Sequence, residues 1–299
     1  MGSLECGTVE DKKYLNSLWQ QVFQDSEDYV NRFFASYYQE GMVYIWKEDG
    51  VIVTVLYALP SLIKIPKRGE GKTAFIKAAY LYAIATDPKY RGRHYLEQML
   101  PALKKQLGEN TVLFLVPEKG VIPYYQSLGL LCKKSLTDSF VESPWSRQVI
   151  TEDFLDRMVI SNLRDAGTYR SIREQAFHEK PHVVWNEKEI AYAMKELLEC
   201  GGQIYLVEID KKEYLLAGYV EEETEEERKQ KGGEKKRFDN PSKVFHIVEK
   251  TIPFTSDNAK IQEKLLTKLG FEKFRIDDLF YMIDTELETD LYLSLALND

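Results

Sequence analysis

Cysteine and histidine are scarce in this sequence, and their spacing defines neither a disulfide framework nor a metal centre. Three cysteines and four histidines occur in 299 residues, and the cysteines are far apart. His178 and His182 have a four-residue spacing that could bind a metal on one helix face. Pro181 interrupts that helix, however, and no third ligand is near. We therefore expect no metal site and a reducing compartment.

Long apolar runs and an excess of basic residues are also missing. No run of about 18 apolar residues could span a membrane, and the first residues lack the basic-then-apolar order of a signal peptide. Forty Lys and Arg against 48 Asp and Glu give a net charge of −8, which argues against bulk nucleic-acid binding. There is no G-x-S-x-G motif and no P-loop. We expect a cytoplasmic protein without a nucleic-acid or membrane partner.

Residues 80–107, YLYAIATDPKYRGRHYLEQMLPALKKQL, carry the clearest functional pattern. Residues 80–86 are apolar and favour a β-strand, which Asp87-Pro88 ends with a turn. From Leu96 onward, apolar residues recur every three or four positions, as on a buried helix face. The pattern predicts a strand, a tight basic turn and a helix.

A basic, glycine-containing turn at the start of a helix favours an anion. The first helical turn has N–H groups without intrahelical partners, and the helix dipole is positive there. Arg91, Gly92 and Arg93 stand at this point of the sequence. We predict a phosphate-binding turn; the alternative is an ordinary solvated surface.

The two halves of the chain repeat one plan of elements. The first half is predicted to contain two helices, a hairpin turning at Asp49-Gly50, and then a strand, a helix, a strand and a helix. The second half is predicted to have helical residues 151–177 and 188–199, a hairpin, a strand, a helix at 258–269 and a last strand at 279–284. This order predicts two α/β domains, residues 1–145 and 146–299.

The second half differs from the first where the phosphate turn should recur. Residues 254–258 contain no Arg-Gly pair and no basic cluster. Residues 221–240 are almost wholly charged and most simply form a solvated hairpin loop, with a regulatory role as the alternative. The second domain is thus predicted to lack the phosphate turn.

Two segments resemble a known family. YAIATDPKYRGRHYLEQML is similar to the cofactor-binding segment of the GNAT superfamily of N-acetyltransferases, and VIPYYQSLGL to the segment after the family's fifth strand. The resemblance is good over residues 43–131 and looser over 151–299, where it depends on element order. The whole chain resembles the tandem-GNAT architecture of enhanced-intracellular-survival-type acetyltransferases, without their third domain.

The resemblance implies a fold and an activity. The fold would be α/β, with two tandem GNAT-like domains that are each a mixed, mostly antiparallel sheet flanked by helices. The activity would be transfer of acetyl from acetyl-CoA, without a metal, to a primary amine of a small molecule or peptide. The acidic chain suits a cationic acceptor such as an aminoglycoside, a polyamine or a lysine side chain. A different acyl donor stays open, and the second domain would complete the acceptor cleft or a homo-oligomer interface.

The resemblance also implies roles for particular residues. The pyrophosphate would lie on backbone N–H groups of the turn, formed by Arg91, Gly92, Arg93, His94, Tyr95 and Leu96. Backbone groups near Ile84 and Ala85 would bind pantetheine and the oxyanion. Tyr125 would protonate the departing thiolate, unless it is simply a packed core tyrosine. Tyr124 is expected to be packing. The general base stays open between Glu40, Asp28, Glu249 and water.

Two positions of the turn depart from the family pattern. His94 stands where an inner glycine is expected, and Leu96 stands where Gly or Ala is expected. Glycines let the backbone approach a pyrophosphate closely. The His94 side chain could crowd the phosphate, or turn away and offer its own N–H. The alternative function is therefore a catalytically silent GNAT-fold binding or structural module.

Overall fold

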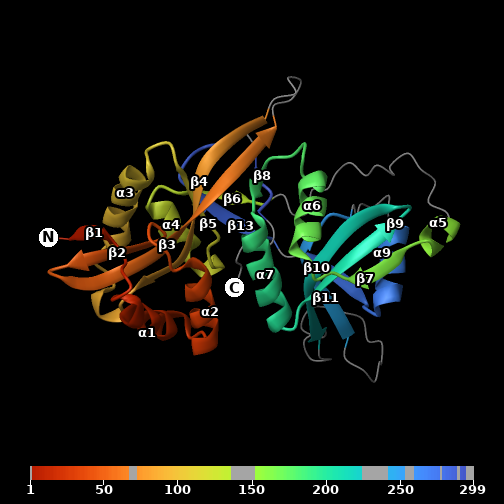
Figure 1. Cartoon of the computed structure of the whole chain (residues 1–299), viewed down its shortest axis with the longest axis horizontal. Helices are drawn as coiled ribbons and strands as arrows, with labels where there is room; N and C mark the ends of the chain where they lie inside the picture. Colours follow the sequence, from red (N-terminus) through yellow and green to blue (C-terminus); the bar gives the residue numbers. More distant parts are fainter. Residues whose placement is uncertain are drawn as a thin grey trace. The chain divides into compact units, whose positions relative to one another are not determined.

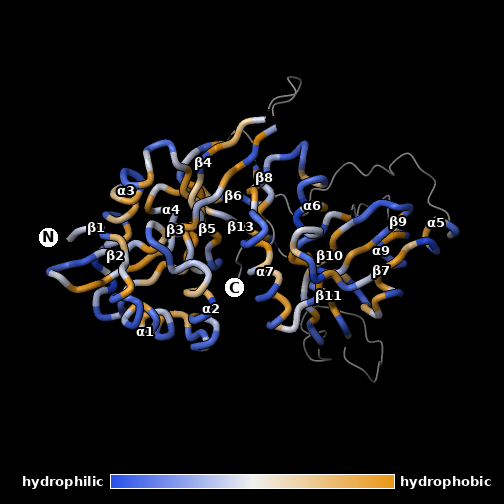
Figure 2. The backbone as a smooth tube through the Cα atoms, in the orientation of Figure 1, coloured by the Kyte–Doolittle hydropathy of each residue, from blue (hydrophilic) through white to orange (hydrophobic). Residues whose placement is uncertain are grey.

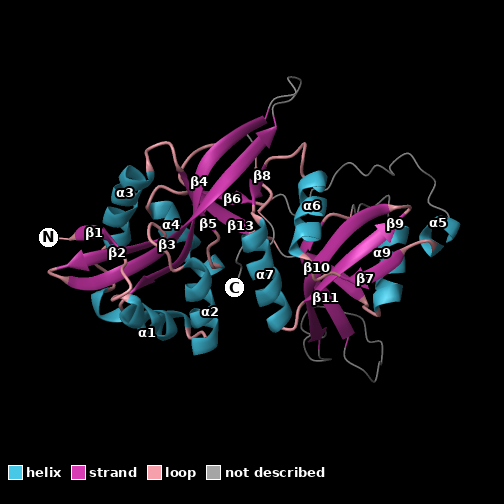
Figure 3. Cartoon of the chain, in the orientation of Figure 1, coloured by secondary structure: helices cyan, strands magenta, loops and turns pink. Residues whose placement is uncertain are grey.

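A computed structural model describes residues 2–66, 73–135, 152–223, 242–252, 259–276, 278–287 and 290–293. The chain divides into two compact units, Met1–Lys134 with Phe280–Asp290, and Ser135–Leu279 with Leu291–Asp299. Each unit contains a sheet flanked by helices (Figure 1, Figure 3). The predicted layered α/β fold with two mixed, mostly antiparallel sheets is confirmed.

The sheet of the first unit has the strand order β1-β2-β3-β4-β5-β13-β6. Among the neighbours in this order, β4 and β5 pair in parallel and the other described pairs are antiparallel. The β2–β3 hairpin turns at Asp49 and Gly50, with φ +49° and +78°, as the Asp-Gly pair predicts. The strands are β1 (Ser3–Cys6), β2 (Val43–Glu48), β3 (Val51–Pro66), β4 (Thr73–Thr86), β5 (Val112–Leu115), β6 (Leu131–Lys134) and β13 (Phe280–Ile283).

The helices of the first unit begin close to the predicted positions. They are α1 (Lys12–Phe23), α2 (Glu27–Tyr37), α3 (Tyr95–Leu107) and α4 (Ile122–Ser127), with short 3-10 turns at Pro88–Tyr90 and Lys119–Val121. Ser26 is the N-cap of α2, since its Oγ accepts a hydrogen bond from the backbone N–H of Tyr29 at 3.2 Å.

The two faces of this sheet pack against different helices. Leu56 of β3 belongs to an apolar cluster with Met99 of α3. The next residue, Tyr57, points to the opposite face, where its ring lies 5.3 Å from Trp19 and 5.1 Å from Phe33 of α1 and α2. Hydrophobic stretches run along the central strands, while many of the connecting turns are hydrophilic (Figure 2). Helix α3 is thereby fixed against β2–β5, with its N-terminus at the end of β4.

Strand β13 belongs to the sheet of the first unit, although the sequence pattern assigned it to the second half of the chain. It lies between β5 and β6 and pairs antiparallel with both. The blue β13 is visible among the yellow strands in Figure 1. Tyr281, Met282 and Ile283 are at most 1% exposed, so apolar burial on the edges of β5 and β6 explains the position.

The sheet of the second unit has the order β12-β11-β10-β9-β7, with β11 and β12 parallel. Residues 151–177 were predicted as helical, which is wrong at β7: Ile160 there pairs with Val207 of β9 and packs in the core. The elements are α5 (Glu152–Asp156), β7 (Val159–Asn162), α6 (Ala166–Ala176), β8 (His182–Val184), α7 (Glu187–Glu199), β9 (Gln203–Ile209), β10 (Lys212–Glu223), β11 (Ser242–Lys250), α9 (Ala259–Leu269) and β12 (Lys273–Ile276).

Two predictions about the second half fall largely outside the described residues. Of the charged segment 221–240, the first three residues continue β10, and residues 224–241 are not described. Residues 253–258, at the position equivalent to the phosphate turn, are not described either. The absence of a phosphate turn in the second half therefore stays a prediction.

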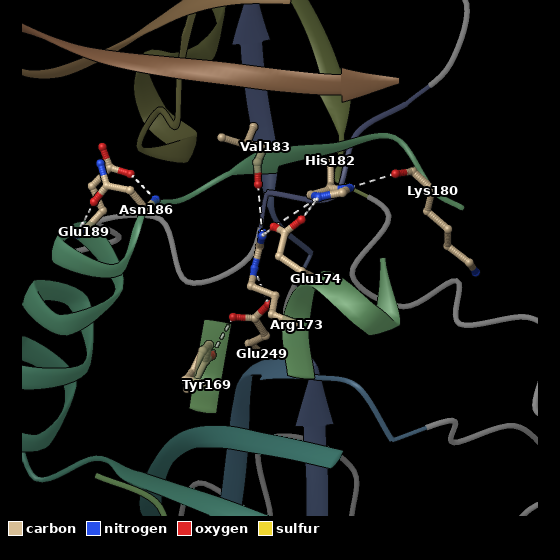
Figure 4. A network of polar contacts seen from close by, with 9 residues as sticks. All are labelled: Tyr169, Arg173, Glu174, Lys180, His182, Val183, Asn186, Glu189 and Glu249. Atoms are coloured by element: carbon tan, nitrogen blue, oxygen red, sulfur yellow. Dashed lines mark hydrogen bonds and ion pairs between the residues drawn. The ribbon is translucent and has the colours of Figure 1, made fainter. Parts of the chain in front are cut away.

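The second unit contains a buried ion pair between α6 and β11 (Figure 4). Arg173 Nε donates to Glu249 Oε1 at 2.9 Å, and both side chains are fully buried. The Tyr169 hydroxyl donates to the other oxygen of Glu249, and Arg173 Nη1 donates to the Val183 carbonyl at 3.0 Å. Glu249 follows a bulge in β11, since Ala217 pairs with Glu249 and the adjacent Gly218 pairs with Ile247.

Candidate functional site

The predicted site residues gather around one pocket of the first unit. The pocket has a volume of about 390 Å³ and lies where β4 ends, α3 begins and α4 approaches. The predicted residues on its lining are Ile84, Arg91, Gly92, Arg93, His94, Tyr95, Leu96 and Tyr125. Ala85 is 1% exposed and is not on this lining. The strand–turn–helix of the sequence therefore forms one wall of a cleft.

Two residues of the turn adopt the left-handed backbone conformation. Gly92 has φ +78° and His94 has φ +57°. His94 is the N-cap of α3, but its side chain makes no capping hydrogen bond. The first N–H groups of α3 are therefore not satisfied by a side-chain cap, which is the arrangement that an anion at a helix N-terminus requires. A Cβ at Gly92 would meet nothing within 4 Å, so φ, rather than lack of space, favours glycine there.

The two residues that depart from the family pattern do so in different ways. The His94 side chain is 72% exposed, and its Nδ1 lies 3.6 Å from the Glu97 carboxylate. The Leu96 side chain is buried in the core beside α3, with 4% of its surface exposed. Leu96 can offer an anion its backbone N–H alone. His94 also lies on the pocket lining, so both alternatives for its side chain stay open.

Two arginines make the turn electropositive. Both Arg91 and Arg93 are exposed, and within the described ranges neither forms an ion pair with a carboxylate. Arg91 Nε donates to the Thr86 carbonyl at 3.4 Å, which turns its side chain toward the end of β4. The Arg93 guanidinium lies 5.3 Å from the centre of the Tyr90 ring. Both charges add to the positive end of the α3 dipole.

Strand β4 separates from β5 and carries a bulge beside the pocket. The two strands pair in parallel from Ala78 to Tyr80, and β4 then continues to Thr86 with β3 as its partner on the other edge. On its other edge, Tyr82 pairs with Tyr57 and Ala85 with Val55, so that Leu56 faces both Ala83 and Ile84. Ala83 has φ +44°. A bulge leaves one residue outside the ladder and changes the direction of its neighbours.

Tyr125 presents a protonated hydroxyl at the pocket. Its ring packs against the core of the first unit, and burial, followed by Tyr124 and Glu118, raises the pKa of the phenol to about 12. Within the described part of the chain its hydroxyl makes no hydrogen bond. Tyr124, expected to be packing, is 42% exposed and lies on the same lining, and burial raises the pKa of its phenol as well.

None of the carboxylates suggested as a general base lies at the pocket. Asp28 and Glu40 are exposed elsewhere on the first unit, and Glu249 belongs to the buried ion pair of the second unit. The pocket lining contains no carboxylate among the residues that the structure describes. His178 is exposed and His182 is buried in β8, so the two imidazoles do not share the helix face that a metal pair would need.

Sequence reasoning missed several residues of the lining. Four of them lie inside the two segments that resemble the family, and Val22 comes from α1: Val22, Thr86, Tyr90, Val121 and Tyr124. It also missed the bulge, because Ala83 is not a residue type that indicates a positive φ.

The comparison with protein families agrees with this geometry. Residues 7–130 match the model of the acetyltransferase (GNAT) domain. The search of curated proteins gives no match to the chain. Residues 7–130 therefore form a GNAT acetyltransferase domain, and they include β4, the turn, α3 and α4.

Solved structures of the same fold cover both units. A GCN5-related N-acetyltransferase from Anabaena variabilis superposes with a TM-score of 0.60 at 10% identity, over 95% of this chain and 72% of that one. A probable N-acyltransferase from Enterococcus faecalis gives 0.59 at 13% identity, over 95% and 72%. Eis1 from Mycobacterium abscessus gives 0.53 at 11% identity, over 93% and 66%. The expected likeness to enhanced-intracellular-survival-type acetyltransferases is confirmed at the level of the fold.

The longest helices of the described chain, α3 and α7, have 13 residues each. None of those in the described ranges is long and apolar enough to cross a bilayer.

Proposed function

We propose that this protein is an acetyl-CoA-dependent N-acetyltransferase whose first unit transfers an acetyl group to a primary amine of a small molecule or peptide. The observation that carries the proposal is the pocket at the start of α3, where an uncapped helix N-terminus, two arginines and the β4 bulge meet. The match of residues 7–130 to a GNAT domain supports an acyltransferase. Acetyl-CoA as donor and an amine as acceptor are the finer parts of the proposal.

The residues of the pocket fit a CoA ester. The pyrophosphate would bind the backbone N–H groups of residues 91–96, where no side-chain cap competes. Arg91 and Arg93 would screen its charge, since neither is committed to a carboxylate within the described chain. Pantetheine would lie along the end of β4, in the space left by β5 beyond Tyr80.

The chemistry would be divided between the bulge and α4. Bound acetyl-CoA supplies a thioester carbonyl that a neutral amine attacks. The N–H of Ile84, at the bulge, is better placed to stabilise negative charge on the carbonyl oxygen than that of Ala85, which pairs with Val55. Tyr125 would donate the proton that the departing thiolate needs, and a pKa of about 12 keeps its phenol protonated at neutral pH. Water would serve as the base, because no carboxylate lies on the described lining.

The second unit is proposed to be non-catalytic. Glu249 follows the bulge of β11, just as Ala85 follows the bulge of β4. The Glu249 carboxylate is held by Arg173 and Tyr169. A fully buried, paired carboxylate at this position is not available as a base. We propose that this unit completes the acceptor cleft or an oligomer interface.

The test is a thermal-shift titration with acetyl-CoA. A ligand at 100 times its dissociation constant stabilises the native state by about 2.7 kcal/mol. We expect a dose-dependent rise in melting temperature for the wild type and no rise for Arg91→Glu. Lys105→Glu is the matched control, because it changes the charge equally on an exposed position of α3 away from the pocket, and it should respond like the wild type.

A second step identifies the acceptor. Release of free CoA thiol is measured with a panel of aminoglycosides, polyamines and lysine peptides. A wild type that is not stabilised by millimolar acetyl-CoA would refute the enzyme and favour the catalytically silent module. Stabilisation by acetyl-CoA without turnover on any amine would leave a CoA-binding protein and refute the transferase.

A further inference from the structure

The carboxylate of Asp284 connects β5 with α3, the helix whose first residues line the cofactor pocket. This residue follows β13 and lies more than 150 positions after α3 and β5. Its side chain is 18% exposed and forms an ion pair and a hydrogen bond with Lys104 of α3, whose side chain is 21% exposed. Its other oxygen, Oδ1, accepts the backbone N–H of Leu113 in β5 at 2.9 Å.

The backbone of Asp284 adds a third connection. Its N–H donates to the Leu113 carbonyl at 3.0 Å. Leu113 therefore gives both of its backbone groups to a single residue, one to the main chain and one to the side chain. The regular pairing of β13 with β5 covers Met282 and Ile283. Beyond it, the Asp284 carboxylate takes the place of the backbone carbonyl that a longer β13 would offer. Strand β5 is therefore held for one residue more than the regular pairing covers.

This anchorage acts on the pocket through β5 and α3. Strand β5 has only four residues, and only three of them pair with β4. On its other edge, β13 and Asp284 are its partners in the described chain. The gap in which β4 and β5 diverge thus depends on how residues 282–284 hold β5, and the direction of α3 depends on how Lys104 is held.

We propose that Asp284 is a positioning residue for the cofactor site, which fixes β5 against α3 and thereby sets the pantetheine gap and the phosphate turn. The inference rests on the proposed function, because it assumes that CoA binds there. The chain offers a matched control in the same segment: Lys133 and Glu286 form an ion pair at 2.7 Å that involves neither α3 nor β5.

The experiment uses the full chain in three variants, with coenzyme A as the probe. Asp284→Ala removes both side-chain interactions, Asp284→Asn keeps an acceptor for the Leu113 N–H but loses the charge that faces Lys104, and Glu286→Gln is the control. Isothermal titration gives the dissociation constant for CoA. Hydrogen exchange of the ligand-free protein gives the protection of residues 95–107 and 112–115.

We expect Asp284→Ala to raise the dissociation constant for CoA about tenfold and to lower protection in both segments. Asp284→Asn should lie between it and the wild type, which keeps the test decisive if the alanine variant does not fold. Glu286→Gln should match the wild type in both measurements.

Two results would overturn the inference. One is unchanged protection in Asp284→Ala, because β5 and α3 would then be held by other contacts. The other is lowered protection with CoA affinity equal to that of the wild type, because Asp284 would then be structural only. A wild type that binds no CoA would instead refute the proposed function, and the exchange measurement would still decide whether Asp284 holds the two elements.

Discussion

Removing one partner of the buried Arg173–Glu249 pair should destabilise the second unit strongly. Both side chains are fully buried, and Arg173 Nη2 has no hydrogen-bond partner in the described chain (Figure 4). Glu249→Gln keeps the shape of the side chain and removes its charge, so the buried guanidinium loses its hydrogen-bonded counter-charge and keeps only the partly exposed Glu174 carboxylate, 3.8 Å from Nη1. Breaking a buried pair in this way typically costs about 3–5 kcal/mol. We expect about 3 kcal/mol, because the glutamine can still accept from Arg173 Nε.

The assay is urea unfolding at pH 7, followed by circular dichroism and by tryptophan fluorescence. Coincident transitions with an unchanged slope would allow the shift in midpoint to be converted into a free energy. The double variant Arg173→Met, Glu249→Gln should recover most of the loss, since no fully buried charge then remains and Glu174 is 27% exposed. Asp156→Asn, in the exposed pair with Lys264, is the control and should leave the midpoint unchanged. A loss below about 1 kcal/mol for Glu249→Gln would refute the reasoning.

Three further predictions concern single side chains. Tyr125→Phe should slow acetyl transfer by about 100-fold with unchanged CoA affinity. The wild-type rate should show no loss from Tyr125 ionisation below about pH 10, because the pKa of this phenol is raised to about 12. A fall in the wild-type rate below about pH 10 that disappears in the phenylalanine variant would contradict this. Burial raises the pKa of Glu189 from its ordinary value of 4.5 to about 7, so its contribution to stability is fully present below about pH 4.5 and is lost as the pH rises from there through 7. Glu189→Gln should therefore match the wild type at pH 5 and exceed it at pH 8 by about 1–2 kcal/mol, after allowance for partial solvent screening; equal unfolding curves at pH 8 would refute it. His94→Gly should stabilise the fold by roughly 1 kcal/mol, because φ is +57° at this position. Its affinity for CoA should stay within about threefold of the wild type. A large loss of affinity in a calorimetric titration with CoA would mean that the imidazole contacts CoA.

The parts of the fold that sequence predicted correctly are those fixed by neighbouring residues. Asp49-Gly50 adopts the positive φ angles of a hairpin turn, and Ser26 caps α2 through its own hydroxyl. The turn between β4 and α3 is of the same kind, because Gly92 and the start of α3 are close together in the chain, and its binding of phosphate stays a prediction. Such features depend on a few consecutive residues, and one sequence is enough to indicate them.

The features that sequence did not predict depend on partners far away in the chain. Residues 159–162 lie in a segment with helical spacing, and they become β7 only because β9 offers an edge with matching apolar residues. The bulge at Ala83 exists because β3 and β4 pair on both sides of it, and alanine itself gives no indication of a positive φ. The pocket likewise takes Val22 from α1 and Tyr124 from α4, which no local motif connects to the turn.

The position of β13 has a consequence for any fragment of this protein. A fragment of residues 1–145, the predicted first domain, would lack the strand between β5 and β6. Phe114 and Leu115 pair with Ile283 and Met282, which are at most 1% exposed, so the fragment would expose the unpaired, apolar edge of β5 and should aggregate. Size-exclusion chromatography would show this, and a peptide of residues 278–287 should restore a monomer, because it supplies the strand together with Asp284. A monomeric fragment with the CoA affinity of the full chain would mean that the GNAT domain does not need its distant strand.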